Sequence, residues 1–452
     1  MPQKIINDLT TGSVPKKLIL FALPFMLSTL LQTTYSTVDM IIVGQFVGST
    51  GLSAVSISGQ LIWLVTALCM GFTVAGQIII SQLVGAGKRK ELQITIGTLI
   101  CIVAIGAVVL SVAGICLARP LLTLLKTPPE AYSRALNYLI IMFGGMTFTF
   151  GYNLVSAILR GMGDSKHPFI FVVISSLTNL ILAYIFVGLF GWDVAGSAVA
   201  TVISQALSFV ISVVFLYKNR EGFGFDFKRE SFRIDTRRLR QLIGLGLPLG
   251  LQSCAISISM LFVNKFINEY GLTASATFGT GTRIEQIPWV IVAGIQLACA
   301  AMVGQNIGAG KIDRVKKTVN VSLIISAISA FVFVLVFHFL PKELYSLFTS
   351  DAAVLEMAPM FMLVLTISVP ATSVMCPYCA FVEGIGNARL TLFIALMDGF
   401  VTRILLSLLL DKVFHLGLMS YFLGYGLAAY VSVFIGAVYY YSGIWKKRRL
   451  LV

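Results

Sequence analysis

Long apolar stretches follow one another along this chain, and short polar segments separate them. A helix of about 20 apolar residues is long enough to cross the hydrocarbon core of a bilayer. Twelve stretches reach that length, and 57% of all residues are hydrophobic while only 12% are charged. We therefore predict an all-α integral membrane protein with twelve transmembrane helices, at approximately 15–43, 52–83, 92–118, 133–159, 167–190, 194–217, 239–267, 274–305, 318–340, 355–382, 390–410 and 418–444.

The second half of the chain repeats motifs of the first. The segment SQLVGAGKRKEL at 81–92 returns as GQNIGAGKIDRV at 304–315, and LRGMGDSK at 159–166 returns as VEGIGNAR at 382–389. Both pairs share one and the same offset along the chain, which two separated motifs rarely do by chance in an apolar sequence. Repeats in the same order indicate two homologous six-helix bundles, an organisation typical of transporters when the chain lies in a membrane.

A polar stretch at 218–240 separates the two halves. It carries eight Lys or Arg residues and four acids, and it is the only long polar stretch of the chain. We interpret it as a solvated cytoplasmic linker that can also lie on anionic lipid headgroups. The predicted organisation is an amino-terminal six-helix lobe at 1–217, this linker, and a carboxy-terminal six-helix lobe at 241–452.

The net charge of +14 follows the predicted topology. With the amino terminus inside, 25 of the 33 Lys and Arg residues fall on the inner side and 6 on the outer side, while Arg283 and Arg403 lie within spans. This asymmetry is the positive-inside rule, so it predicts a multi-pass protein of the plasma or inner cell membrane with both termini in the cytoplasm. The basic residues therefore do not require nucleic acid as a partner.

Motifs for nucleotide, metal or catalytic chemistry are missing from the sequence. GAGK lacks the G-x-x-x-x-G-K-[ST] pattern of a P-loop, so we expect no ATP binding to this chain. Cys376 and Cys379 form a C-x-x-C pair, but no second pair or nearby His completes a metal site. The histidines, of which His167 is the first, lie at span ends without partnered acids. We expect that the protein binds no cofactor and is not an enzyme.

Ionisable residues inside a bilayer are costly, so those in the predicted spans are the functional candidates. Ser28, Gln32, Tyr35 and Asp39 follow at spacings of four, three and four, which places them on one face of the first helix. A polar stripe of this kind faces a protein interior or a water-filled cavity. In the second half Asp39 corresponds to Val263, so the acid does not serve the shared scaffold. We expect a functional role, with a merely hydrated helix-end carboxylate as the alternative.

Two neutral oxygen donors lie in other spans of the same half. Asn179 offers a carbonyl oxygen in mid-span, and Thr201 offers a hydroxyl near the start of the sixth span. Carboxylate, carbonyl and hydroxyl oxygens together suit a hard cation such as Na⁺, or a protonatable pocket. Asp39, Asn179 and Thr201 are therefore the candidate cation-coupling set, although spacing does not show that they converge.

The second half has its ionisable residues at other positions. Glu285 lies two residues after Arg283, a spacing at which side chains do not share a helix face. Asp398 and Arg403 are both deep in the eleventh span, where they either pair with each other or face a cavity. The candidate substrate-cavity residues are Gln32, Tyr35, Glu285, Asp398 and Arg403.

A proline interrupts the first helix of each half. ALP at 22–24 returns as GLP at 246–248, at almost the same offset as the other repeated motifs. Because a proline inside a helix frees a backbone carbonyl and allows bending, Pro24 and Pro248 are candidate hinges.

The first span reads LPFMLSTLLQTTYSTVDMIIVGQFVG, and the repeated turns read QLVGAGK, QNIGAGK, RGMGDSK and EGIGNAR. In these segments and over its whole length the chain resembles the multidrug and toxic compound extrusion (MATE) family of the polysaccharide-exporter superfamily. The resemblance implies two lobes around a V-shaped cavity, alternating access, and export driven by inward Na⁺ or H⁺. It also implies a cation site at Asp39, Asn179 and Thr201, but Ala183 stands where a second acid is expected.

The predicted function is secondary active export of amphipathic, cationic small molecules by a monomer in the lipid bilayer. The alternative is a flippase of a lipid-linked oligosaccharide or related amphiphile, which needs a basic cavity and has only Arg283 and Arg403 to build it. A site reduced to Asp39, Asn179 and Thr201 favours H⁺ as the coupling ion, because Na⁺ needs several oxygen ligands in place of its water shell. Backbone carbonyls near Pro24 are the alternative source of Na⁺ ligands.

Overall fold

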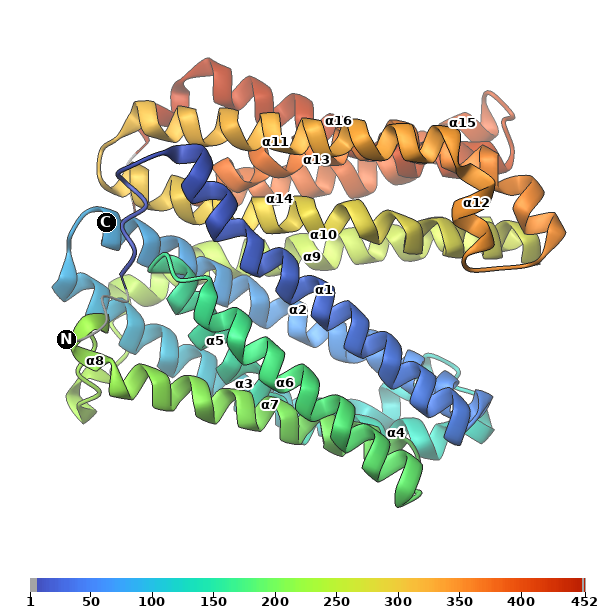
Figure 1. Cartoon of the computed structure of the whole chain (residues 1–452), viewed down its shortest axis with the longest axis horizontal. Coiled ribbons are helices and arrows are strands. Elements are labelled where there is room, and N and C mark those ends of the chain that lie inside the picture. The colour runs from blue at the N-terminus through green and yellow to red at the C-terminus, as the bar shows by residue number, and fades with distance from the viewer. Residues whose placement is uncertain (1–5, 449–450, 452) are drawn as a thin grey trace. The chain divides into compact units, whose positions relative to one another are not determined.

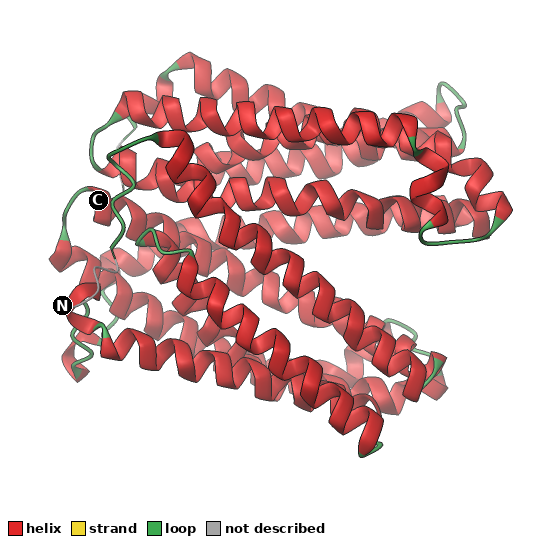
Figure 2. Cartoon of the chain, viewed as in Figure 1, coloured by secondary structure: helices red, strands yellow, loops and turns green. Residues whose placement is uncertain are grey.

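The structure, a computed structural model, describes residues 6–448 and 451. Every regular element in that part of the chain is a helix (Figures 1 and 2). Eleven helices are long and apolar enough to cross a membrane, and the bent pair α4 (Pro129–Gly144) and α5 (Met146–Gly161) supplies the twelfth span. The predicted all-α fold with twelve spans is confirmed.

The remaining helices follow in chain order. The first half also contains α1 (Val14–Phe46), α2 (Ser49–Gly85), α3 (Arg89–Leu124), α6 (Lys166–Ala183), the π-helix η1 (Tyr184–Leu189), α7 (Asp193–Lys218), α8 (Arg220–Phe223) and the 3₁₀ turn η2 (Arg229–Ser231). The second half contains α9 (Thr236–Glu269), α10 (Leu272–Gly308), α11 (Ile312–Phe339), α12 (Pro341–Ser346), α13 (Ala352–Gly384), α14 (Ala388–Leu396), the π-helix η3 (Met397–Leu406), α15 (Ser407–Lys412), α16 (Leu418–Ser442) and the 3₁₀ turn η4 (Ile444–Lys447).

The internal repeat is visible in the positions of the helix ends. Helices α2 and α10 have equal lengths and equivalent limits in the repeat, since Ser49 corresponds to Leu272 and Gly85 to Gly308. Each is followed by its GAGK turn, in which Gly87 has a φ of 69° and Gly310 a φ of 72°. Glycine adopts positive φ without the steric cost that a side chain imposes, which explains why it recurs at both turns.

The second pair of repeated turns has the same backbone. Gly163 has a φ of 85° and Gly386 a φ of 78°. In the first of these turns, Asp164 accepts a hydrogen bond from the backbone N–H of His167 and lies 2.5 Å from its ring Nδ1. The expectation that this histidine has no partnered acid is wrong, because the pair forms across one turn at the start of α6.

The chain divides into two compact units, and two helices belong partly to each. The amino-terminal unit has Leu23–Gly250 as its main part, and the carboxy-terminal unit is formed by Leu9–Ala22 and Leu251–Leu451. Helix α1 therefore contributes its first turns to the carboxy-terminal unit, and α9 contributes its first turns to the amino-terminal unit. The boundaries derived from the repeat, with a linker at 218–240, stay a prediction.

Within each unit one long helix is central. Helix α2 contacts α3, α4 and α5 in the amino-terminal unit, and α13 contacts α10, α11 and α16 in the carboxy-terminal unit. The bent span passes close to α7 at Gly145, the residue between α4 and α5. A side chain at Gly145 would collide with Val202 of α7, so the close approach requires glycine. The bend itself is 47°.

The segment 218–240 folds onto the amino-terminal unit. Phe223 and Phe225 are fully buried, and Arg238 is only 1% exposed and forms an ion pair with Glu91 of α3. The prediction of a solvated linker is therefore wrong for these side chains, because the phenylalanines and the arginine stem bury apolar surface against the helix ends.

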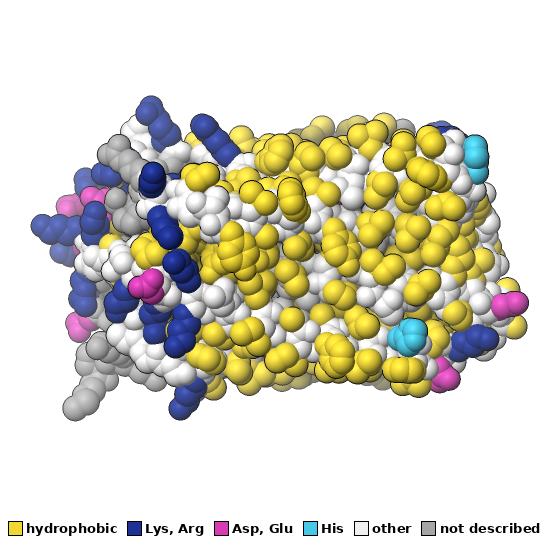
Figure 3. Space-filling view, turned by 90° about the horizontal axis from the view of Figure 1, so that it is seen from above, with side chains coloured by type: hydrophobic (Ala, Val, Ile, Leu, Met, Phe, Trp, Pro, Cys, Tyr) yellow, Lys and Arg dark blue, Asp and Glu magenta, His cyan; other side chains and the backbone are white. Residues whose placement is uncertain are grey.

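Large aliphatic side chains are exposed along the helices. On α3, six of them are each more than half exposed: Ile105, Val108, Val109, Val112, Leu117 and Leu124. Figure 3 shows hydrophobic side chains over the middle of one face, while most Lys and Arg of that face gather at the left of the view. Such a surface is stable in lipid and not in water, so the chain is a multi-pass membrane protein.

Candidate functional site

Asp39 is buried in the amino-terminal unit and has one hydroxyl partner. Its carboxylate accepts hydrogen bonds from the Ser197 hydroxyl of α7, at 2.9 Å to Oδ1 and 2.8 Å to Oδ2. Only 9% of Asp39 is exposed, so the carboxylate belongs to the interior of the unit. This burial argues against a hydrated helix-end carboxylate, and the functional role of Asp39 stays a prediction.

Asn179 and Thr201 form a second polar pair one helical turn away. The Asn179 Nδ2 donates to Thr201 Oγ1 at 3.0 Å, and Thr201 follows Ser197 by four residues on α7. Asn179 Oδ1 is buried and has no hydrogen-bond partner among the described residues. One face of α7 therefore carries both hydroxyls, while Asp39 and Asn179 share no hydrogen bond in the part of the chain that the structure describes.

Ser197 was missed by sequence reasoning. Ser197 lies four residues before Thr201 and therefore on the same helix face. Once Thr201 was a candidate, this spacing could have indicated Ser197 as well.

The position of the absent second acid is closed by aliphatic side chains. Ala183 is fully buried in a cluster with Ile42, Val187 and Ala200. It is the last residue of α6, and the π-helical turn η1 begins at the next residue. Ala183 contributes no side-chain oxygen to a cation site near Asp39.

The rest of the polar stripe on α1 is more open. Gln32 is exposed, and Tyr35 is partly buried. The Ser28 hydroxyl donates to the carbonyl of Pro24 at 2.7 Å. Pro24 lies two residues beyond the point where α1 passes from one compact unit to the other, and Pro248 lies two residues before the corresponding point on α9.

A cavity of about 360 Å³ lies inside the carboxy-terminal unit. Its walls come from α9, α10, α13, α14, η3 and α16. Glu285, Asp398 and Arg403 all line it, so the structure brings together three of the predicted cavity residues. The apolar part of the wall includes Ile256, Met260, Trp289 and Val292.

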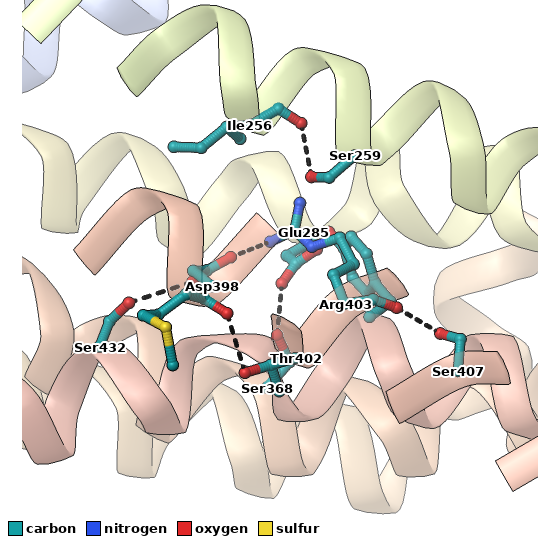
Figure 4. Close-up of polar contacts among 11 residues, drawn as sticks. Ile256, Ser259, Glu285, Ser368, Asp398, Thr402, Arg403, Ser407 and Ser432 are labelled. Carbon is teal, nitrogen blue, oxygen red and sulfur yellow. Dashed lines mark hydrogen bonds and ion pairs between the residues drawn. The ribbon is translucent and has the colours of Figure 1, made fainter. Parts of the chain in front are cut away.

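Each carboxylate in this cavity has hydroxyl partners (Figure 4). Glu285 accepts hydrogen bonds from the Ser368 hydroxyl, at 3.0 Å, and from the Tyr425 hydroxyl. Asp398 accepts a hydrogen bond from the Ser432 hydroxyl at 3.2 Å. Sequence reasoning missed these three residues; Tyr425 and Ser432 are seven residues apart on α16, a spacing that shares one helix face.

Arg403 pairs with one of the two acids. Its Nη2 is 3.0 Å from Asp398 Oδ1, and among the described residues it forms no ion pair with Glu285. Its Cζ is 5.5 Å from the centre of the Tyr425 ring. The pairing with Asp398 and the cavity-lining position were considered as alternatives from sequence, and both are present.

The π-helix η3 produces the ion pair. Asp398 and Arg403 are five residues apart, and an α-helix would turn such side chains to different faces. The π-helical backbone makes hydrogen bonds between residues five apart, which brings those residues above one another. The Thr402 hydroxyl follows the same pattern by donating to the carbonyl of Met397, at 3.2 Å.

A family model described as MatE matches the chain twice, at residues 24–185 and 248–409, so the second match repeats the first at one constant shift. The "Probable multidrug resistance protein YoeA" of Bacillus subtilis is 28% identical over 97% of this chain and 96% of its own length. The "Multidrug export protein MepA" of Staphylococcus aureus is 24% identical over 85% of each chain.

Solved structures share the fold over the whole chain. A transporter of the MOP superfamily from Pyrococcus furiosus superposes with a TM-score of 0.92 at 21% identity, covering 99% of each chain. The two matches of the family model span most of the sequence and carry the internal repeat with them. The chain therefore belongs to the MatE family, whose members are membrane transporters and not enzymes.

Proposed function

We propose that this protein is a secondary active exporter of amphipathic organic cations, driven by inward movement of H⁺ or Na⁺. The observation that carries the proposal is the cavity of the carboxy-terminal unit, in which Glu285 and Asp398 stand beside apolar and aromatic side chains. Apolar walls supply affinity without directional demands, and carboxylates add a preference for positive charge. The names of YoeA and MepA support drug-like substrates.

Asp39 is the residue that couples export to the ion gradient. Its ionised form favours a bound cation, and its protonated or Na⁺-bound form favours release of substrate. Asn179 and Thr201 are the neighbouring oxygen donors that would complete a Na⁺ site, and the unpartnered Asn179 Oδ1 supports this. The aliphatic surroundings of Ala183 leave few oxygen ligands, which favours H⁺ over Na⁺.

Transport proceeds by alternating access in the plasma or inner membrane, in a monomer with both termini in the cytoplasm. The excess of Lys and Arg on the predicted inner side supports this orientation. Pro24 and Pro248 are the hinges, because each lies next to the point where its helix changes from one compact unit to the other.

A lipid-linked oligosaccharide flippase finds less support. Binding of a pyrophosphate requires unpaired basic groups in the cavity. Arg403 is the one arginine among the lining residues, and Asp398 already pairs with it. Arg283 is exposed and is not among the residues that line the cavity.

The test is transport by the purified protein in proteoliposomes that contain no other protein. A lipophilic monocation such as tetraphenylphosphonium should accumulate against its gradient when a pH or Na⁺ gradient is imposed, and substrate should in turn move the coupling ion. Liposomes without protein are the control for leak. Binding of tetraphenylphosphonium without gradient-driven accumulation would contradict the exporter proposal.

A further inference from the structure

The cavity of the carboxy-terminal unit contains an internal cation. Arg403 belongs to the cavity wall, and its Nη2 is bound to Asp398 at 3.0 Å. Both side chains are shielded from the surroundings, with 12% of Arg403 and 7% of Asp398 exposed. In such an environment an ion pair behaves as one neutral group, because separating its charges is costly.

Glu285 is the carboxylate left over. Its partners are the hydroxyls of Ser368 and Tyr425, which are neutral. With the two carboxyl groups and the guanidinium of the wall in their charged forms, the cavity carries two negative charges and one positive charge. Its net charge is that of one carboxylate.

The geometry points to Arg403 as the residue that sets the charge of the substrate. A monocation neutralises the cavity, whereas a dication leaves one uncompensated positive charge beside Arg403 in a weakly polarisable interior. We therefore propose that Arg403 restricts the cavity to singly charged organic cations. This inference rests on the proposed function for the identity of the cavity as a substrate site, and it adds the charge class of the substrate.

Arg403 also covers an aromatic face of the cavity. The guanidinium also lies over the Tyr425 ring, at 5.5 Å from its centre, and this face of the aromatic ring would otherwise attract a second positive centre. Arg403 therefore occupies the place that the second charge of a dication would take.

The experiment measures equilibrium binding to the purified full chain in lipid nanodiscs, at mildly alkaline pH and without an ion gradient. Two probes share one planar biaryl frame and differ in charge: N-methyl-phenylpyridinium is a monocation, and methyl viologen is a dication. The readout is the ratio of their affinities. Arg403→Gln removes the internal cation, and Arg283→Gln is the matched control, since that arginine does not line the cavity.

The unaltered protein should bind the monocation more tightly. In Arg403→Gln the affinity for the dication relative to that for the monocation should rise about tenfold or more, while Arg283→Gln should leave this ratio unchanged. The double variant Asp398→Asn with Arg403→Gln restores the charge of a single carboxylate, so its ratio should return to that of the unaltered protein. An Arg403→Gln protein that keeps the original ratio would overturn the inference.

Asp398→Asn tests the same charge count if Arg403→Gln does not fold. It leaves Glu285 and Arg403 with a net charge of zero, so binding of the monocation should weaken although the Glu285 carboxylate is intact. Undiminished binding would overturn the inference. Failure of both probes to bind the unaltered protein would overturn the inference and the proposed cavity together. If the unaltered protein binds the probes with the predicted charge selectivity but shows no gradient-driven transport, only the exporter proposal is contradicted and the inference about Arg403 stands.

Discussion

The two compact units place their buried acids differently. In the amino-terminal unit Asp39 is bound by one serine, and no basic side chain forms an ion pair with it among the described residues. In the carboxy-terminal unit Glu285 and Asp398 share a cavity with Arg403. One unit thus holds an isolated carboxylate, which suits exchange of a small cation, and the other holds a cavity with two carboxylates and one guanidinium, which suits an organic cation.

The repeat shows that these differences are specific to each half. Asp39 corresponds to Val263, which is fully buried in an aliphatic and aromatic cluster. Glu285 corresponds to Ile62, which packs against the cluster of Val43 and Val55. Each half has apolar packing where the other has its acid, so neither acid is needed to build a six-helix bundle.

The largest expected effect comes from Asp39→Asn. The amide keeps the shape of the side chain and can still bond to Ser197, but it cannot carry the charge that responds to H⁺ or Na⁺. Gradient-driven accumulation should fall about tenfold to a hundredfold, as expected for the loss of a coupling free energy of about 1–3 kcal/mol. The measurement is the steady-state accumulation ratio in proteoliposomes.

Binding of substrate by Asp39→Asn should be close to that of the unaltered protein, which separates coupling from recognition. Ser197→Ala is the companion variant, and it should reduce accumulation less because the carboxylate remains. If Asp39→Asn expresses normally and exports undiminished against the gradient, the assignment of coupling to the amino-terminal unit is wrong.

Glu285→Gln should show the reverse pattern. It removes the unpaired carboxylate of the cavity while keeping hydrogen-bonding groups for Ser368 and Tyr425. Affinity for a monocation should fall about tenfold, which corresponds to about 1.4 kcal/mol. Glu356→Gln, at an exposed acid of α13 outside the cavity lining, is the control. Unchanged affinity in Glu285→Gln would place the substrate elsewhere.

Much of the fold could be predicted because lipid imposes a simple rule on the sequence. Every backbone group must be paired inside its own helix, so length and hydropathy locate the spans. The bend at Gly145 and the burial of Phe223, Phe225 and Arg238 could not be predicted, because they depend on the fit of particular side chains against distant helices.

The candidate residues could be named from the cost of burying charge, but their partners could not. Asp398 and Arg403 are brought together by a π-helical segment, and nothing in an apolar sequence marks that backbone in advance. Ser197 and Tyr425 are ordinary residues for a helix, and only tertiary packing places their hydroxyls on Asp39 and Glu285.

A smaller effect is expected when the second acid is introduced by Ala183→Asp. The new carboxylate would lie among Ile42, Val187 and Ala200, so it should destabilise the fold by on the order of 3 kcal/mol unless a cation or proton neutralises it. Na⁺ should therefore raise the melting temperature of the variant and increase the Na⁺ dependence of transport. Ala183→Asn is the control of similar size. A Na⁺ response equal to that of the unaltered protein would show that this position does not reach the cation site.

The smallest effect concerns Asp226, in a segment that separates the two repeated halves. Oδ1 of Asp226 accepts two hydrogen bonds, from the Ser231 hydroxyl at 2.6 Å and from the backbone N–H of Lys228 at 3.2 Å. These hydrogen bonds hold the pKa of the Asp226 carboxyl below its usual 3.8. A carboxyl whose pKa is lowered by folding stabilises the folded state at pH values above its usual pKa. This stabilisation is lost as the pH falls through the lowered pKa of the folded state. Between mildly acidic conditions and pH values below about 3.8, the melting temperature of the unaltered protein should therefore fall slightly more than that of Asp226→Asn. Equal acid responses of the two proteins would show that these hydrogen bonds do not hold the segment in its folded position.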